Sequence, residues 1–354
     1  MSALAGRRVL VTGGTGFIGG RVVEKLVLEH GARVRVLTSN LARASRVARF
    51  DLELMLGDVS DRAIVRSAAE DCDVIVHCAY GSRGSERERR NVTIEGTRAV
   101  LDAALAARAR RVVHVSNMVV YGIGIEGRLD ETAPRRPTGV EYADTKREAE
   151  ELALRYAREH GAPVTVVQST AVYGPYAPSW TERVVASLKT RRVVLVDGGT
   201  GLANPVYVDD VADAMLLAAV RDEALGEAFL IASGERVTWR EFYGRYEAML
   251  GVSATVDLSR ADAKAHYAES QRRPQPSGER TNAAKAALAP AEKRIQPTHP
   301  KQVDFLAAKT DVSIDKARRL LGYEPAFGLD AGMALTEAYL RWAGMLPDSE
   351  APCA

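Results

Sequence analysis

With 354 residues, 46% of them hydrophobic, the chain is long enough to bury one large core or two modest ones. Its 48 basic and 46 acidic residues nearly cancel, which gives no reason to expect a nucleic-acid or membrane-surface partner. The three cysteines and six histidines show no disulfide or metal-ligand spacing, and no stretch reaches the roughly 20 apolar residues of a membrane span. We therefore expect a cytoplasmic protein without a metal site or membrane anchor.

The first half of the chain alternates short β-branched runs with longer helical patterns. The predicted strands are 8–12, 33–38, 52–56, 73–78, 111–116 and 163–168, and the predicted helices are 17–30, 60–70, 91–107 and 142–160. Strands that alternate with helices form parallel sheets covered on both faces, and their crossovers are right-handed. The pattern therefore predicts an α/β fold with a Rossmann-type, doubly wound parallel sheet.

In the second half of the chain glycine and proline become frequent and the elements become shorter. The later predicted elements are helices at 208–220, 239–250, 313–321 and 329–343 and a strand at 228–231. We predict a first domain over 1–172, to which 204–222 returns, and a smaller, discontinuous C-terminal region over 173–203 and 223–350. Within that region 259–301 is polar and lacks a clear period, so we expect a long loop or partly ordered insertion there.

Three glycines at a spacing of three, Gly13, Gly16 and Gly19, follow the first strand directly and open the first helix. The first permits a tight turn, the second lets the backbone approach a pyrophosphate, and the third lets the helix pack closely on the sheet. The helix start adds free N–H groups and the positive end of a dipole for phosphates. The pattern predicts dinucleotide binding, with contacts from Gly13, Thr15, Gly16, Phe17, Ile18 and Gly19.

The spacing Gly-x-x-Gly-x-x-Gly resembles that of the extended short-chain dehydrogenase/reductases, in their epimerase/dehydratase-like branch. Other segments resemble this family in the same order along the chain, at 57–59, 77–79, 95–97, 173–175, 207–210 and 315–325. The resemblance implies a nicotinamide-dinucleotide-binding Rossmann domain, a C-terminal region that binds a small-molecule substrate and, as one option, a homodimer. The further cofactor contacts that it implies are Asp58, Val59, Cys78, Ala79, Tyr80, Ser116, Tyr142, Lys146 and Val172.

Tyr142 and Lys146 are four residues apart on a predicted helix, which places both side chains on one face, one turn apart. A free tyrosine with a pKa of about 10 is a poor proton carrier near neutrality, and a neighbouring ammonium lowers that pKa. Tyr142 can then exchange a proton with a substrate oxygen while hydride moves to or from nicotinamide. By the resemblance, Lys146 also holds the nicotinamide ribose.

Counted back from Tyr121 and Gly122, Asn117 occupies the position of the family's catalytic serine or threonine. An asparagine amide can donate a hydrogen bond to a substrate oxygen, but it cannot relay a proton as a hydroxyl does. Ser116 is one position away on the strand, and side-chain alternation directs it to the opposite face. We therefore expect Asn117 to act as an oxyanion-type donor.

The end of the second predicted strand, 37–40, carries no carboxylate for the ribose 2′-hydroxyl of NAD. Ser39, Asn40 and Arg43 could instead bind a 2′-phosphate, so we expect NADP, with NAD as the alternative. The arginine-rich stretch 83–90 could close over an anionic ligand, although a solvated charged loop is the commoner interpretation.

The residues together predict an NAD(P)(H)-dependent oxidoreductase that interconverts a ketone or aldehyde and an alcohol on a small metabolite. A nucleotide-sugar epimerase or dehydratase with tightly bound NAD is an alternative, weakened because Ala203 and Gln168 stand where the family often has arginines. A dinucleotide-binding sensor without catalysis is a second alternative, which Asn117 would permit and the retained Tyr142 and Lys146 oppose.

Overall fold

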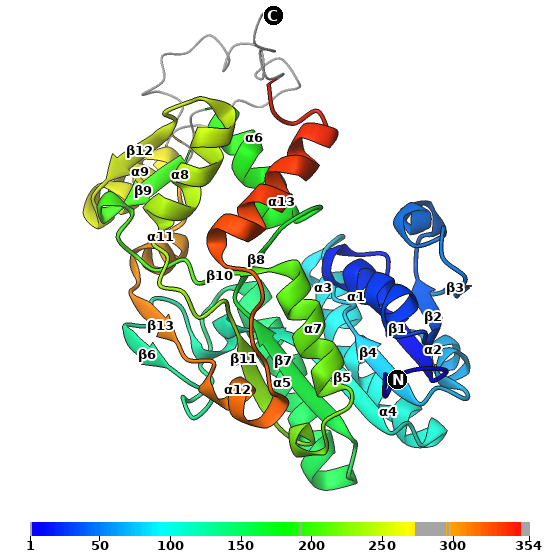
Figure 1. The fold of residues 1–354 in the computed structure, drawn as a ribbon. Helices are drawn as coiled ribbons and strands as arrows, with labels where there is room; N and C mark the ends of the chain where they lie inside the picture. Colours follow the sequence, from blue (N-terminus) through cyan, green and yellow to red (C-terminus); the bar gives the residue numbers. More distant parts are fainter. Residues whose placement is uncertain (1, 191–192, 273–294, 296, 348–354) are drawn as a thin grey trace, which may run out of the picture.

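The computed structural model describes residues 2–190, 193–272, 295 and 297–347. Its central strands are β1 (Arg8–Thr12), β2 (Arg33–Thr38), β3 (Glu53–Leu56), β4 (Val74–His77), β5 (Arg111–Asn117), β7 (Val164–Ser169) and β11 (Ala228–Ile231). They form one sheet in the order β11-β7-β5-β4-β1-β2-β3, and all neighbours pair in parallel (Figure 1). The predicted Rossmann-type α/β sheet is therefore confirmed.

Helices cover both faces of this sheet. They are α1 (Phe17–Leu28), α2 (Arg62–Ala69), α3 (Glu86–Arg90), α4 (Gly96–Ala107), α5 (Glu141–His160) and α7 (Val208–Ala218). Val9 and Val11 of β1 belong to the core under α1 and α7, whereas Leu10 belongs to the core under α2, α4 and α5. Successive side chains of a strand point to opposite faces, so a strand buried on both faces is apolar without alternation.

The first strand of the chain, β1, lies in the interior of the sheet. β1 pairs with β2 on one side and with β4 on the other, so the strand order reverses at this point. In open α/β sheets, ligands bind outside the carboxyl ends of the strands where the order reverses. The ends of β1, β2 and β4 are therefore the place to look for a site.

Three parallel strand pairs and six helices complete the described chain. The pairs are β6 (Gly127–Leu129) with β13 (Thr310–Val312), β8 (Ala171–Tyr173) with β10 (Pro205–Tyr207), and β9 (Val193–Val196) with β12 (Thr255–Leu258). The helices are α6 (Arg183–Lys189), α8 (Trp239–Leu250), α9 (Arg260–Arg272), α11 (Pro300–Ala307), α12 (Asp315–Leu321) and α13 (Leu329–Trp342). In the described ranges, no helix has the length and apolarity that crossing a bilayer requires.

The polar stretch 259–301 differs from the long loop that its sequence predicts. Helix α9 occupies its first part and α11 begins at its end, while 273–294 and 296 lie outside the described residues. Ala263 is the one buried residue of α9, so this helix carries no apolar stripe of helical period. Contacts with other elements hold this helix, including an ion pair of 2.6 Å between Lys264 and Asp304 of α11.

Two ion pairs connect α7 to α1. Arg21 pairs with Asp209 at 2.7 Å, and Lys25 pairs with Asp213 at 2.8 Å. Helix α7 lies within 204–222, the segment predicted to return to the first domain. The division of the chain into two domains stays a prediction.

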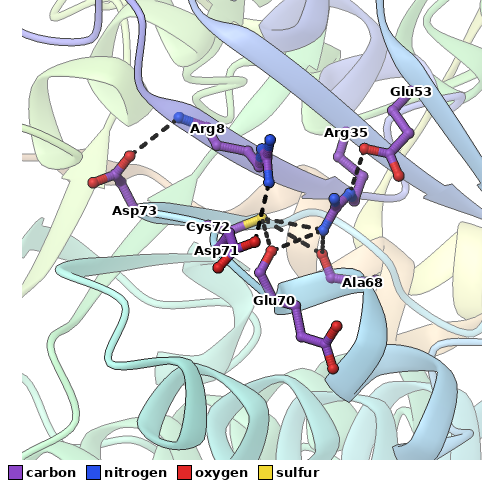
Figure 2. Close-up of polar contacts among 8 residues, drawn as sticks. All are labelled: Arg8, Arg35, Glu53, Ala68, Glu70, Asp71, Cys72 and Asp73. Atoms are coloured by element: carbon purple, nitrogen blue, oxygen red, sulfur yellow. Dashed lines mark hydrogen bonds and ion pairs between the residues drawn. The ribbon is translucent and has the colours of Figure 1, made fainter.

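Arg35 of β2 joins two strands and a helix on the α2 side of the sheet (Figure 2). Its buried guanidinium donates to the carbonyl oxygens of Ala68 and Glu70, at 2.8 and 2.9 Å, and pairs with Glu53 at 2.8 Å. The last carbonyls of a helix lack intrahelical partners, so Arg35 satisfies groups that α2 leaves open at its end.

Replacing Arg35 with glutamine should lower the free energy of unfolding by about 2 kcal/mol, because buried carbonyls lose a charged donor. The matched control Arg33→Gln changes an exposed residue of the same strand and should cost less than about 0.5 kcal/mol. Urea denaturation of both variants measures the difference. Equal effects of the two substitutions would contradict the role given to Arg35.

Candidate active site

The turn between β1 and α1 has no room for side chains at two of its glycines. Gly13 has a φ of +70°, and a Cβ there would lie 2.7 Å from the backbone nitrogen of Ala79. A Cβ at Gly19 would overlap the carbonyl oxygen of Gly13. The first glycine therefore lets the turn lie against the segment after β4, and the last lets α1 lie against the turn.

A cavity of about 1070 Å³ lies at the carboxyl ends of β1, β2 and β4. The predicted cofactor-binding residues that line it are Gly13, Thr15, Gly16, Ser39, Arg43, Asp58, Val59, Cys78, Ala79 and Tyr80. The other predicted residues of the glycine turn and of the later strands, Phe17, Ile18, Gly19, Asn40, Ser116 and Val172, are not part of its described lining. The structure thus brings together most of the predicted contacts, while their role in binding a cofactor stays a prediction.

The segment after β2 is shaped by Asn40. Its side-chain oxygen accepts a hydrogen bond from the backbone nitrogen of Ala42 at 2.9 Å and caps the 3₁₀ turn Leu41–Arg46. This turn carries the exposed Arg43 to the cavity. Asn40 therefore holds the turn in place, and Arg43 is the side chain of this pair that lines the cavity.

One wall of the cavity comes from residues that the sequence did not assign to the site. They are Gly81, Ser82, Arg83, Gly84, Arg87, Glu88, Arg90, Asn91, Val92, Ile94 and Glu95. They belong to the loop after β4, to α3 and to a π-helical turn, Asn91–Glu95, so the helical segment predicted to begin at Asn91 begins at Glu86 instead. The signal present in the sequence was the arginine-rich stretch 83–90, and π-helical turns are frequent at functional sites.

Tyr142 and Lys146 lie one turn apart at the start of α5 and line a second cavity, of about 210 Å³. Lys146 is buried, and its ammonium donates to the carbonyl oxygen of Val115 in β5 at 2.9 Å. Burial lowers the pKa of Lys146 to about 8. This contact holds the face of α5 that carries Tyr142 and Lys146 against the sheet.

The pKa of the Tyr142 phenol is shifted in the direction opposite to the one that the sequence predicted. Burial raises this pKa, and the neighbouring Tyr80 adds to the rise, whereas the predicted effect of Lys146 was to lower it. The ammonium of Lys146 donates to the carbonyl of Val115 in place of the phenol. Because 46% of Tyr142 is exposed, solvent moderates the shift, and the phenol is protonated at neutral pH.

Asn117 ends β5 and lines a third cavity, of about 690 Å³, together with Tyr142. Its amide nitrogen donates to the carbonyl oxygen of Thr170 at 3.3 Å, and its oxygen accepts from the backbone nitrogen of Val119 at 3.1 Å. One of the two amide N–H groups is left for a ligand. Ser116 is buried, and its hydroxyl has no partner among the described residues.

The third cavity is mostly apolar. The apolar and aromatic members of its lining are Tyr80, Met118, Val119, Ile123, Val140, Tyr142, Ala143, Ala171, Trp180, Val184, Val193, Val194, Tyr243, Pro297, Phe305 and Leu306. Half of them come from the second half of the chain, including α6, β9 and α11. The arrangement can place a bulky apolar ligand against Tyr142 and Asn117.

Two histidines lie side by side in the sheet beneath this site. His77 and His114 are paired across β4 and β5, both are buried, and burial lowers the pKa of each, that of His77 to about 3. His77 is held by hydrogen bonds to Thr12 and Thr97, at 2.7 and 3.0 Å. Both rings are therefore neutral core groups, and the described residues contain no group of three or more His, Cys, Asp or Glu that could hold a metal ion.

The model of the NAD dependent epimerase/dehydratase family matches residues 9–232. A ketoreductase of Stigmatella aurantiaca, named for the substrate 4-hydroxy-2-methyl-3-oxo-4-farnesyl-3,4-dihydroquinoline-1-oxide, is 31% identical over 352 residues. The alignment covers 96% of this chain and 99% of that relative. A dTDP-glucose 4,6-dehydratase of Streptomyces niveus is 31% identical over 252 residues, which cover 65% of this chain and 74% of the relative.

Solved structures agree with this match. A dTDP-glucose 4,6-dehydratase of Streptomyces venezuelae with NAD bound has a TM-score of 0.74 at 25% identity, covering 96% of this chain and 98% of that one. A UDP-glucose 4-epimerase of Thermotoga maritima has a TM-score of 0.72 at 22% identity, covering 95% and 99%, and shows the same fold. The chain belongs to the NAD-dependent epimerase/dehydratase family, as the sequence motifs indicated, and is an enzyme of this oxidoreductase, epimerase and dehydratase class.

Gly19→Ala should weaken dinucleotide binding about tenfold or more, because the added Cβ would overlap the carbonyl oxygen of Gly13 and displace the turn. The matched control is Gly20→Ala in the same helix, where the nearest atoms, those of Arg46 and the carbonyl oxygen of Gly14, lie at an ordinary contact distance of 3.5 Å from an added Cβ. That variant should bind normally and gain up to about 1 kcal/mol in stability. Fluorescence titrations with NADH and NADPH compare the two, and equal affinities would refute the packing role of Gly19.

Proposed function

We propose that this family member is an NADP(H)-dependent reductase that interconverts a ketone and an alcohol on a bulky apolar metabolite, with Tyr142 as general acid and base. The observation that carries the proposal is the third cavity, because its largely apolar lining includes both Tyr142 and Asn117. Ligand sites of this kind combine apolar walls with a few polar groups that fix the orientation of the ligand.

The lining favours an apolar substrate over a sugar nucleotide. A diphosphate needs cationic side chains where it binds. Two positions at which the family often has arginines hold Ala203 and Gln168, both buried, and the amide of Gln168 donates to Glu150 at 2.7 Å. The basic residues of the lining, Arg183, His299 and Lys301, are exposed.

The ketoreductase of Stigmatella aurantiaca supports the same substrate class. The substrate in its name carries a farnesyl chain on a quinoline ring system, which makes a large and mostly apolar molecule. The alignment runs over nearly the full length of both chains and so includes the second half of this one, from which most of the cavity lining comes.

The acid and base groups suit reduction. When bound, the dinucleotide supplies or accepts the hydride. Because burial raises the pKa of Tyr142, its phenol holds a proton that it can donate to a ketone oxygen. Lys146, with a pKa lowered to about 8 by burial, is still largely a cation at neutral pH. Asn117 has an amide N–H left to donate to the same substrate oxygen.

Ser39 and Arg43 support NADP(H). Both line the first cavity where a ribose 2′-phosphate would lie, beside the end of β2. Asp58, a carboxylate of the lining, follows β3 and accepts hydrogen bonds from Ser60, at 2.7 and 2.8 Å. The segment after β2 therefore offers a cation and a hydroxyl where an NAD-specific site has a carboxylate.

A second candidate is a sugar-nucleotide dehydratase, favoured by the likeness to the Streptomyces niveus enzyme. The diphosphate of such a substrate would have to bind Arg183 and Lys301 at the exposed edge of the third cavity. Mass spectrometry of the nucleotide released on denaturation separates the two. Stoichiometric NAD would favour the dehydratase, and exchangeable NADP would favour the reductase.

Tyr142→Phe should lower kcat about 100-fold or more, because it removes the proton donor, while the affinity for NADPH is retained. The matched control Tyr156→Phe lies on the same helix, and its hydroxyl donates to Asp102 at 2.9 Å, outside the described cavities. NADPH oxidation with a ketone substrate measures kcat. Unchanged turnover in Tyr142→Phe would remove this residue from the mechanism.

Phe305→Ser should raise the KM for a prenylated aryl ketone about tenfold or more, because it takes apolar surface out of the third cavity. The affinity for NADPH should not change. The control Leu335→Ser alters an exposed apolar side chain of α13 outside the lining. Efficient turnover of dTDP-glucose, with no activity on apolar ketones, would contradict the proposed substrate class.

A further inference from the structure

Residues 81–90 follow β4, contain four arginines and lie along the first cavity. Their short helix, α3, begins with a capping box. The hydroxyl of Ser85 accepts from the backbone nitrogen of Glu88 at 3.3 Å, and the carboxylate of Glu88 accepts from that of Ser85 at 2.6 Å. Glu88 is therefore engaged at the helix start rather than by an arginine.

Two neighbouring arginines hold this segment against α5. Arg89 pairs with both carboxylate oxygens of Glu141, and Arg90 pairs with Glu148 at 2.8 Å. A Cβ at Gly81 would overlap the backbone of Arg89, so the preceding loop also packs closely on α3. The arginines at the cavity are thus carried by a segment with defined anchors, unlike those of a freely solvated loop.

The charged side chains that line the first cavity differ in whether they have partners among the described residues. The four carboxylates have partners, namely Asp58 with Ser60, Glu88 with Ser85, Glu95 with Arg98, and Glu148 with Arg90. Arg43, Arg83 and Arg87 also line the cavity, and they make no ion pair or side-chain hydrogen bond with the described residues. The cavity therefore presents three guanidinium groups without an ion pair in the described part of the chain, beside Asp58 and Glu88, whose serine partners leave their negative charge in place.

These three cations lie on both sides of the glycine turn. Arg43 follows β2, while Arg83 and Arg87 follow β4, and β1 lies between those two strands. The turn at the end of β1 leads into α1, whose free N–H groups are suited to a pyrophosphate. Arginine binds phosphate oxygens with two parallel hydrogen bonds, which makes it the side chain suited to complete such a site.

We propose that Arg83 and Arg87 bind phosphate groups of the dinucleotide on the side of the glycine turn opposite Arg43. This assignment rests on the proposed dinucleotide-dependent function. Since Arg89 belongs to the same segment and lines the second cavity beside Tyr142, the phosphate contacts also order a wall of the catalytic site.

The test measures the affinity of the full chain for NADPH and NADH by fluorescence titration, at low and at high salt. The double variant R83Q/R87Q should lose about tenfold or more in affinity at low salt, and its affinity should depend less on salt. The control R33Q/R66Q removes two exposed arginines that are outside the described lining, and it should bind as the native chain does.

Equal losses for NADPH and NADH would place the two arginines on the pyrophosphate that both share, as proposed. A loss for NADPH alone would place them on the 2′-phosphate, on the side of Arg43, and would overturn the proposal. Affinities within about twofold of native for both dinucleotides, in a variant with an unchanged melting temperature, would overturn it and leave the proposed function intact. A native chain that binds neither dinucleotide would overturn both.

Discussion

The close contact between the glycine turn and the segment after β4 determines where the first cavity lies. Gly13 is so near Ala79 that a single added carbon would come within 2.7 Å of its backbone nitrogen. Because β1 is paired on both sides, the turn cannot move away without breaking ladder hydrogen bonds of β2 or β4. The first cavity, the arginine segment that continues from Ala79, and the start of α1 are therefore placed together by one backbone contact.

A second contact places the chemistry. The ammonium of Lys146 donates to the carbonyl of Val115, which joins α5 to the strand that ends in Asn117. Tyr142 and Asn117, the proton donor and the amide donor of the proposed reaction, are thus positioned from the same strand. Burial acts on Tyr142 and Lys146 in the direction that disfavours charge, raising the pKa of Tyr142 and lowering that of Lys146. A phenol that holds its proton at neutral pH, beside a lysine that is still largely a cation there, suits the proposed donation of a proton to a ketone.

Helices and strands whose own residues carry a clear pattern of buried side chains were predictable from the sequence. The strand 228–231 and the helix 239–250 have the predicted bounds, since burial imposes a pattern on each. Strands β6 and β13 were not predicted, because each has three residues and its partner is far along the chain. Helix α9 buries one alanine and leaves no pattern. For the site, the motifs indicated Tyr142, whereas the ion pair of Arg89 with Glu141 joins residues 52 positions apart, which no local pattern encodes.

The distribution of charge on the two sides of Tyr142 connects the fold to the choice of substrate. On the side of the first cavity, arginines that make no ion pair within the described ranges follow β2 and β4, so this side can donate hydrogen bonds to the phosphates of a dinucleotide. On the side of the third cavity, the lining is mostly apolar. Outside that lining, buried Gln168 and Ala203 occupy positions at which the family often has arginines. A diphosphate bound in the third cavity would lose water without gaining a buried cation, at a cost of several kcal/mol. The apolar body of a ketone substrate loses only unfavourable hydration on entering the same cavity, which agrees with the proposed substrate class.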